Sequence, residues 1–191
     1  MEGKLIIFSA PSGSGKTTIL KRLLAKGIPL EFSVSACSRP MRNGEVDGKD
    51  YYFLTVEEFK NKIANNEFLE WEEVYAGSFY GTLKSELTRI WQTGKHVVFD
   101  LDVLGGVNVK KIFKEKALAL FILPPSVEEL EKRLINRSTE TPESLKKRLD
   151  RAKMELSYAP EFDVCIINDN LDVAIEKAEK AILNFINASH E

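Results

Sequence analysis

Cysteine and histidine are scarce in this sequence. Its 191 residues include only two cysteines, Cys37 and Cys165, so at most one disulfide can form. Cys165 lies in the apolar run 164–167, which favours a reduced and buried thiol. The two histidines, His96 and His190, have no cysteine near them in the sequence. The pattern therefore predicts no metal site built from His and Cys side chains.

Long apolar runs and a strong charge imbalance are also missing. No run approaches the ~18 apolar residues that a membrane span requires, and the run 5–8 is too short for a secretion signal. The formal net charge is −2, which disfavours nucleic-acid binding through bulk positive charge. We therefore expect a cytoplasmic protein with no membrane partner and no nucleic-acid partner.

The length and the composition fit one compact α/β domain, with 43% hydrophobic and 29% charged residues. Strands are expected at 5–8, 97–99, 117–123 and 163–167, of which 97–99 is buried. A half-exposed strand is expected at 68–72, before a glycine-bracketed turn at 77–81. Helices are expected at 17–25, 83–91, 107–116 and 172–187. Further helices are expected after the capping boxes Thr55–Glu58 and Ser126–Glu129, and from Pro142. Strands that alternate with helices predict a mostly parallel sheet with helices on both faces.

The stretch 10–17 joins the first strand to the first helix and fits the phosphate-binding loop, except that Ala10 stands where the pattern has its first glycine. Gly13 and Gly15 allow a tight turn whose N–H groups form an anion nest. Lys16 adds positive charge for the β- and γ-phosphates, and the Thr17 hydroxyl is placed to bind Mg²⁺. The predicted triphosphate site is Ala10, Pro11, Ser12, Gly13, Ser14, Gly15, Lys16 and Thr17. The alternative is a turn that only links a strand to a helix.

A second group of residues suits a phosphorylated acceptor. Arg39 and Arg42 lie in a turn-rich region, and Tyr51 and Tyr80 follow as phenolic donors. A guanidinium group matches phosphate oxygens in pairs, so this set would hold a monophosphate well. The alternative is two solvated arginines and two half-buried tyrosines.

Asp100 and Asp102 follow the strand 97–99, at the end where ligands bind in parallel sheets. Residues two apart on a strand project to one face, and like charges placed side by side need a cation to balance them. The alternative is that this acidic pair caps the helix that follows. Asn168 and Asp169 follow the last strand in the same way, and the alternative for Asn168 is that Asn168-Asp169-Asn170 only forms a turn.

Together these motifs resemble the guanylate kinase family. The resemblance is found in the runs 35–45, 48–51, 67–71 and 80–82. It is also found in the phosphate loop, in Asp100-Leu101-Asp102, in the segment 133–148 and in Ile167-Asn168-Asp169. The likeness spans nearly the whole chain in the family's order. One departure is Leu104, where the family often has glutamine.

The resemblance implies an α/β fold of the P-loop NTPase type: a parallel sheet core flanked by helices, with a small GMP-binding lobe and a helical lid. Residues 1–191 would form one domain with its core at 1–34, 83–123 and 151–191, its GMP-binding lobe at 35–82 and its lid at 124–150. A hinge is expected within 136–141. Such a protein would be a monomer or a weak homo-oligomer.

The implied reaction is ATP + GMP ⇌ ADP + GDP in purine nucleotide metabolism, with dGMP as a further acceptor and Mg²⁺ as cofactor. By resemblance, GMP is bound by Ser35, Arg39, Arg42, Tyr51, Glu70, Tyr80, Thr82, Asp100 and Asp102. Asn168 joins the phosphate loop in binding ATP, and Thr17 and Asp100 hold the metal. The catalytic residues would be Lys16, Arg42, Arg133, Arg137 and Arg148, the last three closing over the transferred phosphoryl group as lid arginines.

Two other functions remain open at this point. A guanylate kinase-like domain can act as a binding module without catalysis, although such domains usually have a damaged phosphate loop. A kinase of the same fold can also act on another phosphorylated acceptor. The complete set of predicted GMP contacts weighs against this second alternative.

Overall fold

A computed structural model of the chain describes residues 3–135 and 142–188, with only the backbone at 142–145. The contacts divide the chain into two compact units. The smaller unit comprises Met1–Gly3 and Pro29–Val97, and the larger unit comprises Lys4–Ile28 and Val98–Glu191.

The larger unit is built on parallel strands. β1 (Leu5–Ser9) pairs in parallel with β8 (Ala117–Leu123), and β8 pairs in parallel with β9 (Val164–Ile167). The sheet has five strands in the order β2-β7-β1-β8-β9, with β7 at His96–Asp100 and β2 at Leu30–Phe32. All of β2 and the first two residues of β7 belong to the residues of the smaller unit. Every residue of β1 is buried, because helices cover both faces of the sheet. The predicted fold class and the four predicted strands of this unit are confirmed, although β9 is only partly buried.

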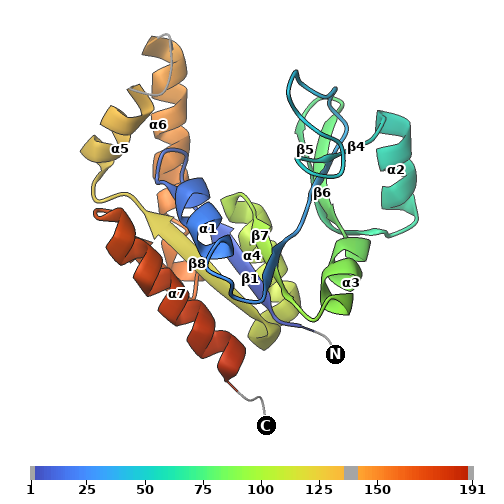
Figure 1. The fold of residues 1–191 in the computed structure, drawn as a ribbon. Helices are drawn as coiled ribbons and strands as arrows, with labels where there is room; N and C mark the ends of the chain where they lie inside the picture. The colour runs from blue at the N-terminus through green and yellow to red at the C-terminus, as the bar shows by residue number, and fades with distance from the viewer. Residues whose placement is uncertain (1–2, 136–141, 189–191) are drawn as a thin grey trace. The chain divides into compact units, whose positions relative to one another are not determined.

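Helices cover the two faces of these strands. α1 (Lys16–Leu24) and α7 (Leu171–Asn187) lie side by side on one face of β1 and β8, and α4 (Val103–Phe113) packs on the other (Figure 1). α5 (Val127–Ile135) and α6 (Pro142–Leu156) pack on each other through Leu130, Leu134, Leu149 and Ala152. Short 3-10 helices occupy Lys114–Lys116 and Ala159–Glu161. Within the described ranges, no helix combines the length and apolarity that crossing a membrane requires.

The larger unit differs from expectation in the start of one helix and in the burial of one cysteine. The helix expected at 107–116 begins at Val103, because the Asp102 side chain accepts a hydrogen bond from Gly105 N at 2.8 Å and caps it there. Cys165 is exposed, because β9 is the edge strand of the sheet. Both Cys37 and Cys165 are free thiols.

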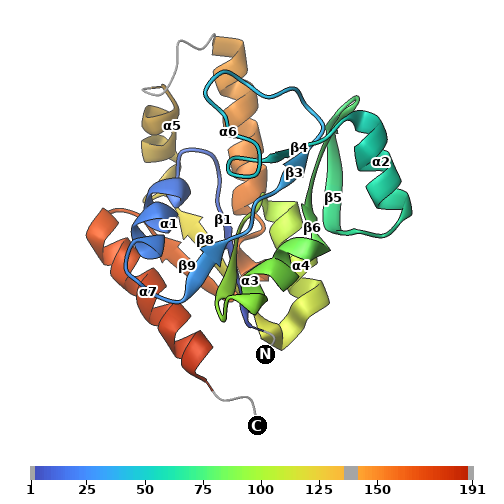
Figure 2. The ribbon, with the colours of Figure 1, turned by 45° about the vertical axis from the view of Figure 1, so that its right-hand side comes forward.

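The smaller unit has a sheet of its own. β3 (Ala36–Cys37), β4 (Tyr52–Phe53), β5 (Phe68–Tyr75) and β6 (Ser78–Leu83) follow the order β4-β3-β6-β5 (Figure 2). α2 (Val56–Ala64) packs on this sheet, α3 (Lys84–Gln92) follows β6, and the predicted capping box at Thr55 is confirmed. Its core is aromatic: the Phe59 ring stacks on Phe68 at 4.3 Å and on Phe79 at 5.5 Å between centroids.

The turn expected at 77–81 is wrong, because residues 78–83 form strand β6. The chain reverses between Tyr75 and Ser78, where Gly77 has a φ of 77°. Gly81 instead lies inside the strand. A Cβ at that position would lie 2.6 Å from Glu70 O and 2.8 Å from Trp71 Cβ, so glycine here permits the close approach of β5.

Gly106 brings α4 close to the end of β1. A Cβ at Gly106 would overlap Ser9 Oγ and would lie 3.3 Å from a ring carbon of Phe162. The same Ser9 hydroxyl donates a hydrogen bond to Asp102 O at 3.1 Å. The absence of a side chain at Gly106 therefore helps to position the segment that follows β7.

We expect Gly106→Ala to lower the free energy of unfolding by about 1–3 kcal/mol, the usual effect of overpacking, even though alanine favours helix. Urea denaturation measures the change. Ser9→Ala removes the overlapping oxygen, so the double variant should lose less stability than the two single losses combined. Strictly additive losses would contradict the close approach.

Candidate active site

The segment 10–17 has the strand–turn–helix form that a phosphate-binding loop requires. It leaves β1 and enters α1 at Lys16, and Gly13 and Gly15 have φ values of 94° and 91°. Only glycine adopts such angles readily. Side chains of α5 also pack against the loop. A Cβ at Gly13 would lie 3.0 Å from Leu130 Cδ1 and 3.4 Å from Leu134 Cδ2.

Lys16 reaches from the loop to the carboxyl end of β7. Its ammonium group forms an ion pair with Asp100 and donates a hydrogen bond to Leu101 O at 3.0 Å. The two charged side chains are 17% and 25% exposed, so both remain accessible to a ligand. The structure thus brings together two of the predicted site residues.

Thr17 and Asp100 offer the oxygen ligands that Mg²⁺ prefers. The Thr17 residue is exposed at the start of α1, and Asp100 is partly exposed. Across residues 3–135 and 142–188, no group of three or more His, Cys, Asp or Glu side chains could hold a metal ion. The oxygen donors of Thr17 and Asp100 fit Mg²⁺, an ion that usually takes several further ligands from phosphate oxygens and water.

Asp102 has a structural role in this arrangement. Its carboxylate caps α4, and its carbonyl accepts the Ser9 hydroxyl. The sequence left open the alternative that this acidic pair caps the following helix. That alternative is correct for Asp102, whereas Asp100 pairs with Lys16. Whether Asp102 also contacts GMP stays a prediction.

The predicted lid arginines differ in how the structure places them. Arg133 on α5 donates from Nε to Glu129 Oε1 at 3.1 Å and from both terminal nitrogens to Asn168 O at 3.4 Å. Arg148 is exposed on α6. Arg137 and the expected hinge at 136–141 lie outside the described residues.

Asn168 reaches the phosphate loop from the end of β9. Only 6% of the residue is exposed, and its Nδ2 donates to Ser14 O at 2.8 Å. The sequence placed Asn168 with the triphosphate only by resemblance. Its contact with Ser14 was not predicted, because the two residues are far apart in the sequence.

In the smaller unit, Arg39 is held by a carboxylate. Arg39 Nη1 and Nη2 donate to the two Glu45 oxygens at 2.7 and 2.6 Å, and its guanidinium lies 5.0 Å from the centroid of the Tyr51 ring. The Tyr51 and Tyr80 rings are 6.1 Å apart, edge to face. Three of the predicted phosphate contacts, Arg39, Tyr51 and Tyr80, therefore form one cluster.

Glu45 is a residue that sequence reasoning missed. Besides its pairing with Arg39, its Oε2 accepts the backbone N–H of Arg42 at 2.7 Å and so closes the turn that carries this exposed arginine. The ion pair with Arg39 and the hydrogen bond from Arg42 N lower the pKa of Glu45 to about 2. The available signal was an acidic side chain three residues after Arg42, at a spacing typical of turns.

Glu70 and Thr82 are neighbours across β5 and β6. They face each other in register, and Thr82 Oγ1 donates to Glu70 Oε1 at 2.7 Å. Thr82 is 1% exposed, whereas Glu70 is half-buried. Ser35 lies directly before β3, and its carbonyl accepts Tyr52 N at 2.9 Å. Two of the three predicted guanine contacts thus form a hydrogen-bonded pair.

A second carboxylate that sequence reasoning missed supports this region. Glu86 at the start of α3 is 2% exposed and accepts hydrogen bonds from Val34 N, Tyr52 Oη and Arg89 Nε, each at 2.8 Å. Burial alone would raise the pKa of Glu86, but these donors outweigh burial and lower it. Glu86 therefore fixes the segment next to Ser35.

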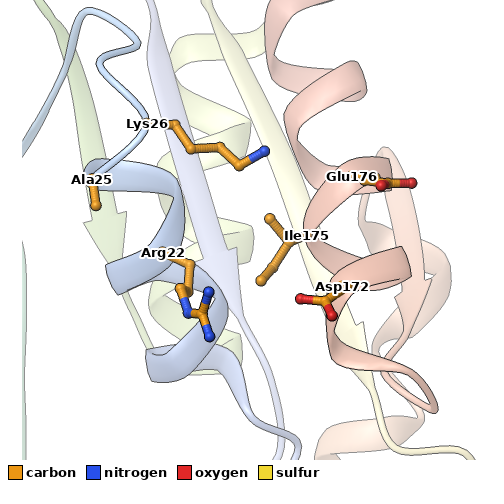
Figure 3. Close-up of a pocket in the computed structure, with 6 residues that line it drawn as sticks. All are labelled: Arg22, Ala25, Lys26, Asp172, Ile175 and Glu176. Atoms are coloured by element: carbon orange, nitrogen blue, oxygen red, sulfur yellow. The ribbon is translucent and has the colours of Figure 1, made fainter.

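A pocket of about 400 Å³ opens between α1 and α7, away from these residues (Figure 3). Arg22 of α1 and Lys26, just after this helix, lie opposite the acidic side chains of α7, and Ile175 lies between them. The lining residues are Arg22, Ala25, Lys26, Asp172, Ile175 and Glu176. None of them belongs to the predicted sites.

A parallel sheet, a loop with two left-handed glycines and a lysine at the start of the next helix define a P-loop nucleotide-binding protein. The guanylate kinase family model matches residues 2–184. The chain is 54% identical to a guanylate kinase of Bacteroides fragilis over 190 residues, which is 100% of this chain and 93% of that protein. It is 51% identical to a guanylate kinase of Porphyromonas gingivalis, over 96% of this chain and 98% of the other.

A solved structure supports the same assignment. The crystal structure of guanylate kinase from Anaplasma phagocytophilum has 28% sequence identity and a TM-score of 0.77, covering 98% of this chain and 88% of that one. The chain belongs to the guanylate kinase family, whose members are ATP-dependent nucleoside monophosphate kinases.

We expect the Glu45 carboxyl to titrate with a pKa of about 2, well below its ordinary value of 4.5. The ion pair therefore stabilises the fold fully above pH 4.5, and this contribution is lost as the pH falls toward 2. Carbon-13 NMR of the carboxyl groups measures the pKa directly.

Arg39→Ala should return the Glu45 pKa toward its ordinary value. Glu58 is the control, because its lowered pKa comes from Thr55 and should not respond to this change. A wild-type Glu45 that titrates in the ordinary range would contradict the bidentate pairing.

Proposed function

We propose that this protein transfers the γ-phosphoryl group of ATP to GMP, giving ADP and GDP, and that dGMP is a further acceptor. The observation that carries the proposal is the occurrence in one chain of an intact phosphate loop and of the pair Glu70–Thr82 beside the cluster Arg39–Tyr51–Tyr80. The loop suits a triphosphate. The pair and the cluster together suit a nucleoside monophosphate whose base has adjacent hydrogen-bond donors.

At the donor, the loop N–H groups and Lys16 bind the β- and γ-phosphates. Thr17 and Asp100 would hold Mg²⁺, and the bound ion would supply neutralisation of the phosphate charge. Asp100 already pairs with Lys16, so it can orient the lysine and contribute an oxygen to the metal shell. The positive end of α1 points at the same site.

At the acceptor, Arg39, Arg42, Tyr51 and Tyr80 hold the phosphate of GMP. Guanine presents N1–H and its exocyclic amine side by side, and the Glu70 carboxylate can accept both. Adenine has no N1 proton and would set a ring lone pair against this carboxylate. Sites built from buried polar groups reject such a mismatch strongly, by factors up to ~10⁴–10⁵. Ser35 and Thr82 can donate to the other guanine edge.

The reaction needs no dedicated general base, because the attacking oxygen of GMP is already anionic. The barrier lies in bringing two polyanions together and in stabilising charge on the transferred phosphoryl group. Lys16, Mg²⁺ and the arginines at 133, 137 and 148 supply the positive charge. Water must be excluded during transfer, since ATP would otherwise be hydrolysed.

We further propose that the protein acts in the cytoplasm, in purine nucleotide metabolism, as a monomer or a weak homo-oligomer. Its partners are ATP and GMP or dGMP, with no membrane and no nucleic acid. The net charge of −2 supports the last point, because nucleic-acid binding draws on clustered positive charge.

We expect ADP to form from ATP and Mg²⁺ when GMP or dGMP is supplied, and to a far smaller extent with AMP, CMP or UMP. A coupled spectrophotometric assay compares these acceptors directly. Absence of turnover with GMP would contradict the proposal and favour a binding module, whereas preference for another acceptor would favour a different kinase of this fold.

In the same assay, Lys16→Ala should lower kcat by at least about 10²–10³-fold, the typical effect of removing one preorganised cationic or hydrogen-bonding group. Lys21→Ala changes an exposed lysine of the same helix and should keep full activity. Circular dichroism checks that both variants fold. Wild-type activity in Lys16→Ala would remove the lysine from the mechanism.

We expect Glu70→Gln to reduce kcat/KM for GMP by about 100-fold, because a neutral amide cannot accept both guanine donors as a carboxylate does. Its dissociation constant for ATP, measured by calorimetry, should stay within about twofold of wild type. Glu72→Gln is the matched control, since Glu72 is an exposed glutamate of the same strand. Equal losses for GMP and ATP would exclude a base-reading role for Glu70.

A further inference from the structure

Asn168 is fixed at the meeting point of three elements. Its backbone N–H donates to Leu123 O at 2.8 Å, at the end of β8. Its carbonyl accepts the Arg133 guanidinium of α5 at 3.4 Å. Its side chain is turned toward the phosphate loop, where Nδ2 donates to Ser14 O at 2.8 Å. Because only 6% of the residue is exposed, little of it is left to face a nucleotide base.

The hydrogen bond to Ser14 O fixes the direction of a peptide group in the loop. In a trans peptide the C=O and the following N–H point to opposite sides. With Ser14 O held toward Asn168, the Gly15 N–H is directed away from Asn168. A Cβ on Gly15 would overlap the Asn168 amide, so the two residues are in direct contact. Without the amide donor, Ser14 O would lose its partner and the peptide would be free to rotate.

We propose that Asn168 is a positioning residue for the phosphate loop: it acts on the triphosphate through the Ser14–Gly15 peptide and does not read the adenine base. This inference rests on the proposed function, because it assumes that the loop binds a triphosphate. It assigns the side chain of Asn168 a contact with the protein, whereas the family resemblance placed this residue directly at ATP.

The test uses a ligand that has no base. Isothermal titration calorimetry measures the binding of Mg²⁺-tripolyphosphate, ATP and GTP to the full chain. For Asn168→Ala we expect a loss of about tenfold in affinity, of the same size for all three ligands. The dissociation constant for GMP should not change. Asn168→Asp keeps the size of the side chain but lacks the N–H donor, so it should fold like wild type and show at least the same loss.

Asn170→Ala is the matched control for stability. Asn170 lies two residues away and caps α7, with its Oδ1 accepting Val173 N at 3.1 Å, and it has no contact with the loop among the hydrogen bonds of the described residues. Loss of this cap destabilises the protein, and thermal unfolding measures by how much. Triphosphate affinity should nevertheless stay at the wild-type value.

The possible outcomes separate this inference from the proposed function. A loss confined to ATP, with tripolyphosphate binding unchanged, would overturn the inference and identify Asn168 as an adenine reader. An equal loss in Asn170→Ala would also overturn it, because general destabilisation would then explain the effect. If wild type binds tripolyphosphate but does not phosphorylate GMP, the proposed function fails, and a tenfold loss in Asn168→Ala would still support the inference.

Discussion

Phosphate binding in this protein depends on a backbone conformation that almost any side chain would prevent. Gly13 and Gly15 both have left-handed φ angles, and each is also crowded by its surroundings. Leu130 of α5 packs against the first, and Asn168 packs against the second. The loop is therefore more than a flexible turn between a strand and a helix. Because neighbouring elements are built against its two glycines, the shape of the anion nest is set by the packing of the larger unit before any ligand is bound.

Three cationic side chains of the predicted site share a second property, which is that a carboxylate of the protein holds each of them. Lys16 pairs with Asp100 and Arg39 with Glu45, and Arg133 contacts Glu129. These pairs restrict long side chains that would otherwise lose much entropy on binding. A phosphate must replace or share these carboxylates. A phosphate group can do so because it carries more charge than a carboxylate and accepts paired hydrogen bonds from a guanidinium group.

Features that depend on neighbouring residues in the sequence were predictable, whereas features that depend on spatial neighbours were not. The phosphate loop and the cap at Thr55 follow from short patterns, and both are as predicted. Gly81 was interpreted as part of a turn because the sequence does not show that Glu70 O approaches it across the sheet. The exposure of Cys165 required the strand order, which places β9 at the edge. For the same reason, the contact of Asn168 with the loop could not be read from the sequence.

In the proposed function, recognition of the base and recognition of the phosphate would rest on different parts of the smaller unit. Glu70 and Thr82 are fixed by the pairing of β5 with β6, so the direction of the carboxylate is set by the register of a sheet. Arg42 instead lies on a turn that one carboxylate, Glu45, closes. Side chains on paired strands are positioned more narrowly than those on loops. Under this proposal, selection of the base would depend on the geometry of the paired strands, whereas the turn would supply charge that can adjust to the phosphate. A change of base preference would then require substitutions on β5 and β6 and could leave the phosphate contacts as they are.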